Sequence, residues 1–111
     1  MTLEDLQNFI NEQDTLFRSA KSASQTERER VLARTVKISE ELGELCDVVL
    51  ASMGDQRSGK LEVRDSENLS GEFADVIITT FLLAKSMNVN VSEALEKKIK
   101  KIRERHNKQL A

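Results

Sequence analysis

The sequence predicts an all-α protein, a four-helix bundle that is completed by homo-oligomerisation. Its 111 residues include no proline and only four glycines, whereas sheet proteins need turn residues in quantity. Hydrophobic residues make up 39% of the chain and charged residues 32%, which is enough apolar material for one core. The length fits a single domain over residues 1–111, and apolar residues recur at helical spacing along most of it.

The first two helices are predicted over residues 3–20 and 26–53. The first, capped by Thr2, has apolar residues at helical spacing: Leu6, Phe9, Ile10 and Phe17. Thr26 and Glu29 stand three residues apart and form the pattern of a capping box at the start of the second helix. Gly54 suits the end of that helix, because glycine adopts the left-handed conformation that terminates helices.

The third helix is predicted over residues 67–87, after a polar loop at 55–66, and Ser92 is expected to cap a fourth helix that ends near residue 108. Residues 73–84 are apolar on almost every side of the third helix, which is typical of a helix covered on most of its surface. A chain of this size cannot cover it alone. We therefore expect an obligate dimer or a higher oligomer.

Composition and charge exclude several classes of protein. No apolar run approaches ~18 residues, so no transmembrane span is expected. The N-terminus is acidic where a signal peptide is basic, and we expect a soluble cytoplasmic protein. The formal net charge of −2 and the absence of Trp and Tyr argue against a nucleic-acid partner. The single cysteine, Cys46, is expected to be a small buried apolar residue.

Two pairs of carboxylates stand out on the second and third helices. Asp75 is the only charge within residues 73–84, and Glu72 precedes it by three residues, so both lie on one helix face. Glu41 and Glu44 repeat this spacing on the second helix. Gly43, which lies between them, lowers helix stability, and we expect some group to approach the backbone there.

If the second and third helices pack antiparallel, these four carboxylates converge. Like charges in a semi-buried place repel unless divalent cations lie between them. Oxygen-only ligands suit Mg²⁺ or Mn²⁺, whereas a di-iron site would require Glu-x-x-His motifs, which the sequence lacks. A solvated helix face is the alternative for either pair alone, but the two pairs together favour a metal site.

The motif Glu40-Glu41-x-x-Glu44, followed after 27 residues by Glu72-x-x-Asp75, resembles the EExxE…ExxD signature of the MazG-like, all-α nucleoside triphosphate pyrophosphohydrolases. The resemblance spans roughly residues 30–106. It implies Mg²⁺-dependent hydrolysis of (deoxy)nucleoside triphosphates to the monophosphate and pyrophosphate, with Mn²⁺ as a substitute metal. It also implies a MazG-like bundle that assembles as a homodimer or a dimer of dimers.

By motif position, the resemblance assigns site residues. The metal ligands would be Glu41, Glu44, Glu72 and Asp75. Glu40 would stand beside them and would orient or deprotonate the attacking water, so the catalytic pair would be Glu40 and Glu41. The water would attack a phosphorus of the α–β anhydride, and pyrophosphate would leave.

Basic residues of the fourth helix would contact the phosphates, as they do in the family. Lys97, Lys101 and Arg105 recur at four-residue spacing and share a face. We expect Lys101 and Arg105 to bind phosphate, with Lys97 or Lys98 next. Several relatives carry an Asn in this segment, and here the nearby positions at apolar spacing are isoleucines. A solvated charged face is the alternative for each of these residues.

Two other functions fit the same residues. One is hydrolysis of a different nucleotide, either phosphoribosyl-ATP-like or modified. The other is a non-catalytic helical interaction module whose acidic residues serve solubility.

Overall fold

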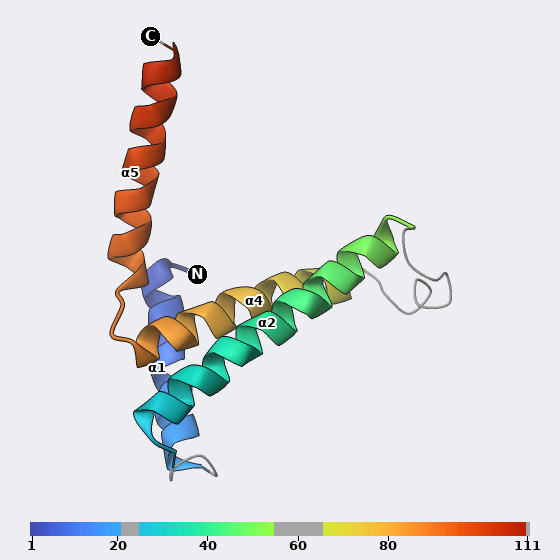
Figure 1. The fold of residues 1–111 in the computed structure, drawn as a ribbon, viewed down its shortest axis with the longest axis vertical. Helices are drawn as coiled ribbons and strands as arrows, with labels where there is room; N and C mark the ends of the chain where they lie inside the picture. The colour runs from blue at the N-terminus through green and yellow to red at the C-terminus, as the bar shows by residue number, and fades with distance from the viewer. Residues whose placement is uncertain (21–24, 55–65, 111) are drawn as a thin grey trace.

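The computed structural model describes residues 1–20, 25–54 and 66–110, and the regular secondary structure within these ranges is entirely α-helical (Figure 1). The helices are α1 (Leu3–Ser19), α2 (Glu27–Ser52), α4 (Ser66–Ser86) and α5 (Val91–Leu110). The all-α prediction is confirmed for this part of the chain. The predicted loop at 55–66 lies outside the described residues except for its last one.

Threonine caps fix the starts of α1 and α2. The Thr2 hydroxyl accepts a hydrogen bond from the Asp5 N–H at 3.1 Å, and the Asp5 carboxylate accepts one from the Thr2 N–H at 2.8 Å. Thr26 and Glu29 exchange the corresponding bonds at 3.1 and 2.9 Å. Each capping box satisfies N–H groups that a helix start otherwise leaves without acceptors. Both predicted caps are confirmed.

The predicted cap of the last helix is wrong. The side-chain oxygen of Asn90, rather than the Ser92 hydroxyl, accepts a hydrogen bond from the Glu93 N–H at 3.1 Å, and α5 already begins at Val91. Asparagine is as good a cap as serine. In the turn before it, Asn88 adopts a left-handed φ of 55°, a conformation that asparagine tolerates better than most residues.

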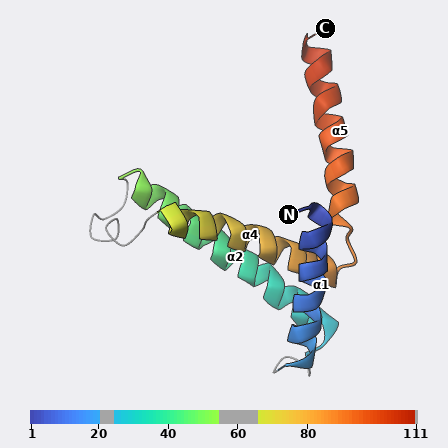
Figure 2. The same ribbon diagram turned by 180° about the vertical axis from the view of Figure 1, so that it is seen from behind.

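Helices α2 and α4 lie side by side and run in opposite directions, while α1 crosses the end of this pair and α5 projects away from it (Figures 1 and 2). A small apolar core joins α1 to α4 through Ile10, Phe81 and Leu82. On α2, Val48 and Ala51 are almost fully buried. The antiparallel pairing that the carboxylate argument requires is therefore present.

Much of the apolar surface of a single chain is open to solvent. Phe73 and Ile77 on α4 are each about half exposed, at 51% and 49%. Similar exposure is found at large apolar residues of α2 and α5: Leu32, Val36, Leu42, Leu95, Ile99 and Ile102. In a single chain, α4 is thus partly exposed, although the sequence predicted that this helix would be covered on most sides.

One smaller expectation is wrong: Cys46 is exposed rather than buried. Around Gly43, apart from its neighbours and the backbone of its own helix, no atom of the described chain lies within 4 Å of the position that a Cβ would occupy. The expectation that another group approaches the backbone there stays a prediction. None of the described helices is both long and apolar enough to cross a bilayer.

Candidate metal centre

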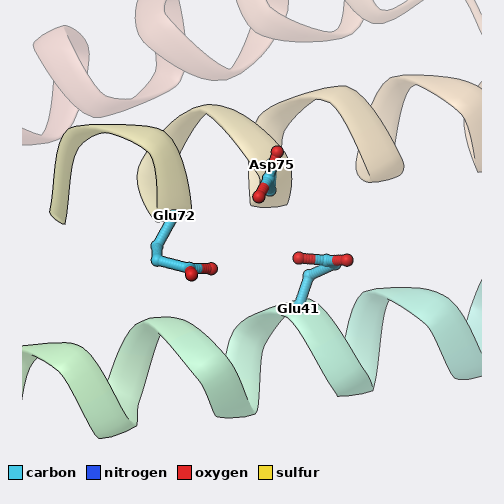
Figure 3. Close-up of side chains that lie close together, drawn as sticks. All are labelled: Glu41, Glu72 and Asp75. Atoms are coloured by element: carbon cyan, nitrogen blue, oxygen red, sulfur yellow. The ribbon is translucent and has the colours of Figure 1, made fainter. Parts of the chain in front are cut away.

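Three carboxylates meet between α2 and α4. Glu41 comes from α2, and Glu72 and Asp75 come from α4; one oxygen of each lies within 4.8 Å of the others (Figure 3). The three-residue spacing places Glu72 and Asp75 on one face of α4, and the antiparallel pairing brings Glu41 opposite them. These three residues are called the carboxylate cluster below.

The carboxylate cluster contains buried charge that the described residues do not fully compensate. Glu41 is only 8% exposed. One oxygen of Glu41 and one of Glu72, Oε2 in each case, are buried without a hydrogen-bond partner. A buried acceptor left unpaired costs about 1–3 kcal/mol, and more when it is charged. The residues present therefore fit a hard divalent cation, which binds carboxylate oxygens and would satisfy both atoms.

One lysine approaches the cluster from α2. The Nζ atom of Lys37 lies 3.2 Å from Oε1 of Glu41 and 3.4 Å from Oε1 of Glu40. Its hydrogen bond to Glu41, and secondarily that to Glu40, raises the pKa of Lys37 above its ordinary value. Lys37 thus pairs with Oε1 of Glu41 and leaves Oε2 without a hydrogen-bond partner in the described residues.

The other two predicted acids of the motif lie at the edge of the cluster. Glu44 is exposed and is not among the three carboxylates that lie within 4.8 Å of one another. Repulsion from Glu41 is the main cause that raises the pKa of Glu44, and Glu72 and Glu40 add to it. Glu40 is exposed and paired with Lys37. Both residues are close enough to contribute to the electrostatics of the cluster.

The structure does not bring the predicted phosphate-binding residues to the carboxylates within one chain. Lys97, Lys98, Lys101 and Arg105 are all exposed on α5, which points away from the α2–α4 pair in both views (Figures 1 and 2). Lys101 and Arg105 do share a face, where they border a shallow depression together with Glu104 and Lys108. Their role stays a prediction.

A second set of basic residues lies nearer the cluster and was not singled out in the sequence. Arg30, Arg34 and Lys37 occupy one face of α2 and lead toward Glu41. They line a cavity of about 420 Å³, here called the arginine pocket, together with Phe17, Gln25, Ala33, Ile78, Thr79 and Leu82. The recurrence of basic residues four and three positions apart, ending at the motif, was the signal that could have revealed it.

A buried ion pair at the edge of the arginine pocket was also missed. Nη1 of Arg34 lies 2.8 Å from Oδ1 of Asp14, and Nε of Arg18 lies 2.8 Å from Oδ2. Burial alone would raise the pKa of Asp14, but the hydrogen bonds from Arg18 and Arg34 outweigh it and hold the pKa below its ordinary value. Asp14 is therefore a buried, fully ionised carboxylate that positions two arginines.

Comparison with known proteins assigns the family. No curated protein and no solved structure gave a significant match to the chain. The model of the MazG nucleotide pyrophosphohydrolase domain matches residues 15–110, a span that includes the whole motif, the carboxylate cluster and the arginine pocket. With nearly its full length matched, the chain belongs to the MazG nucleotide pyrophosphohydrolase domain family.

Proposed function

We propose that the chain, acting as one domain over residues 1–111, hydrolyses (deoxy)nucleoside triphosphates to the nucleoside monophosphate and pyrophosphate, with Mg²⁺ at the carboxylate cluster and Mn²⁺ as a substitute. Family membership supports a nucleotide pyrophosphohydrolase. The observation that supports a bound metal is the pair of buried carboxylate oxygens of Glu41 and Glu72, which have no hydrogen-bond partner in the described part of the chain. Acidic residues that only serve solubility need not be buried, and buried charges without partners lower stability.

Glu41, Glu72 and Asp75 would hold the metal, and Glu44 would complete the ligand set from the edge of the cluster. When bound, Mg²⁺ would offset the charge of the triphosphate and lower the pKa of the attacking water. Glu40 is exposed beside the cluster, so it is accessible to that water and can orient it or accept its proton. Attack on a phosphorus of the α–β anhydride then breaks the bridging bond and releases pyrophosphate.

A second copy of the chain would complete the site. It would cover Phe73 and Ile77, which are about half exposed on α4. It could also bring its own α5 to the cluster and so supply Lys101, Arg105 and Lys97 or Lys98 as phosphate contacts. A homodimer, or a dimer of such dimers, is therefore part of the proposal. Exposed isoleucines and a leucine on α5 provide the apolar side of that contact.

The decisive experiment is product analysis. The purified protein is incubated with the common NTPs and dNTPs in Mg²⁺ and, separately, in EDTA, and pyrophosphate and monophosphate are assayed. We expect equal amounts of the two products, only with metal. Asp75→Asn should abolish turnover, whereas Glu96→Gln, an exposed acid on α5, should not change it.

Other product patterns would contradict the proposal. Release of orthophosphate and a diphosphate would mean that a different bond is cleaved. Turnover that persists in EDTA would remove the metal from the reaction. Absence of turnover of every common nucleotide, combined with absence of Mg²⁺ binding in a calorimetric titration, would favour the interaction module over an enzyme.

A further inference from the structure

The arginine pocket begins one helical turn from the carboxylate cluster on both helices. Lys37 lines the pocket and also contacts Glu41, and Thr79, four residues after Asp75, lines it from α4. Arg34 precedes Glu41 by seven residues, which is about 10 Å along a helix axis. A nucleotide whose phosphates lie at the cluster could therefore place its base in this pocket.

Two N–H groups of the arginines that line the pocket have no acceptor among the residues that the structure describes. The Arg30 side chain is 6% exposed and that of Arg34 is 11% exposed. Nε of Arg30 and Nη2 of Arg34 are buried and have no hydrogen-bond partner within the described ranges. Buried donors in native proteins are almost always paired, so these two groups indicate a ligand that offers acceptor atoms.

The charges of both arginines are already partly offset. Arg34 is paired with Asp14 at 2.8 Å, and Nε of Arg30 lies 3.8 Å from a carboxylate oxygen of Glu27. The remaining donors therefore favour a neutral acceptor over another phosphate.

The rest of the pocket wall is largely apolar. Phe17 of α1 and Ile78 and Leu82 of α4 line it together with the methyl group of Ala33. A flat and largely apolar body that carries a carbonyl oxygen fits such a wall, and a nucleobase is that kind of group.

We propose that the arginine pocket binds the nucleobase of the substrate and selects bases that present a keto oxygen at C6 of a purine or C4 of a pyrimidine to Arg30 and Arg34. This selectivity rests on the proposed function for its place in catalysis. Arginine donors pair with keto oxygen and ring nitrogen acceptors such as O6 and N7 of guanine. An exocyclic amino group at that position is itself a donor and would leave the arginine N–H groups unpaired, so adenine and cytosine are disfavoured.

The test separates base binding from chemistry. Binding of nucleoside monophosphates is measured in EDTA by calorimetry or NMR, comparing IMP with AMP and UMP with CMP, since each pair differs at the edge where keto oxygen replaces amino group. We expect the keto member of each pair to bind roughly tenfold more tightly. Equal affinities within both pairs would overturn the assignment.

A variant tests the residue. Arg30→Met keeps an unbranched apolar stem but removes the donors of Arg30, so the preference for IMP over AMP and for UMP over CMP should fall, while AMP and CMP binding should change little. Arg28→Met, at an exposed position on the same helix, should keep the full preference. Thermal unfolding checks that both variants fold. A preference retained by folded Arg30→Met would overturn the role of Arg30.

Turnover distinguishes this inference from the proposed function. The ratio of kcat/KM for ITP to that for ATP, measured with Mg²⁺, should match the binding preference. Pyrophosphate release at equal kcat/KM from both, with equal binding of IMP and AMP, would overturn base selection but leave the hydrolase standing. A binding preference without pyrophosphate release from any nucleotide would overturn the hydrolase but support the pocket.

Discussion

The carboxylate of Asp14 on α1 and the guanidinium of Arg34 on α2, twenty residues apart in sequence, lie 2.8 Å from each other in a buried contact. The same Arg34 nitrogen donates to the backbone oxygen of Leu82 at 3.1 Å and to the Ser86 hydroxyl, both on α4. One ion pair thus connects three helices. The apolar contact between α1 and α4 is small. We therefore expect the Asp14–Arg34 contact to contribute strongly to the attachment of α1 to the other helices.

Asp14→Asn should therefore destabilise the fold. Removal of one partner of a buried ion pair leaves the other charge uncompensated and costs about 3 kcal/mol, here at Arg34 and Arg18. The free energy of unfolding is measured by urea titration at a fixed protein concentration. Glu12→Gln, which changes an exposed acid on the same helix, should stay within about 0.5 kcal/mol of the parent. A similar small effect of Asp14→Asn would show that the ion pair is not needed.

The same carboxylate predicts a pH dependence. Because the folded state holds the pKa of Asp14 below the ordinary value of 3.8, the unfolded state takes up the proton first as pH falls. The stabilisation by Asp14 is therefore complete above about pH 5 and is lost as pH falls below 3.8 through the lower folded value. The difference in unfolding free energy between the parent and Asp14→Asn should shrink over that range. A difference that stays constant down to pH 2 would contradict this account.

Local patterns in the sequence predicted most of the helices. The two threonine capping boxes depend on residues three positions apart, and both form. The start of the last helix was predicted wrongly because Asn90 and Ser92 are equally good caps. Which of them caps the helix depends on the conformation of the preceding turn. The Asp14–Arg34 contact could not be predicted, because it depends on how α1 crosses α2 rather than on any spacing within one helix.

The carboxylate cluster was predictable in part, because part of it depends on spacing within one helix. The spacing of Glu72 and Asp75 fixes them on one face, and Glu41 follows once α2 and α4 pair. Glu44 has the same three-residue spacing from Glu41, yet it is exposed and lies outside the cluster, so spacing within one helix does not decide which acids meet. The direction of α5 was beyond sequence reasoning, since its apolar residues remain about half exposed in the single chain and so do not fix it against α2 or α4.

Glu72→Gln should change the stability in opposite directions with and without metal. In EDTA, the amide replaces one of the clustered charges and can donate to Glu41 or Asp75, so unfolding should shift upward by about 4 °C. With Mg²⁺ or Mn²⁺ in excess, the parent should gain stability through binding and overtake the variant. Thermal unfolding followed by circular dichroism gives the melting temperatures of the parent and the variant in EDTA and in metal. If neither metal changes the melting temperature of the parent, the result would contradict a cation site.

Thr26→Ala should weaken the start of α2. The substitution removes the acceptor for the Glu29 N–H and disrupts the reciprocal bond to the Thr26 N–H, and loss of such a cap costs about 1 kcal/mol. Thr35→Ala is the matched control, because Thr35 is exposed within the same helix and only bonds back to the Val31 carbonyl. It should be neutral or slightly stabilising. Equal losses in urea titrations of the two variants would mean that the capping box contributes nothing.

Ile77→Asp should prevent self-association. Ile77 is 49% exposed on α4, although α4 is the most apolar of the described helices. A second copy that covers Ile77 would have to bury the new charge without a partner. Sedimentation velocity over a range of concentrations should show a dimer or larger species for the parent and a monomer for the variant. Asn8→Asp adds the same charge at an exposed polar position on α1 and should leave the assembly intact. If the second copy supplies α5 to the site, Ile77→Asp should also lose nucleotide turnover at concentrations where it is monomeric. A parent that sediments as a monomer yet turns over nucleotide would show that one chain holds the whole site.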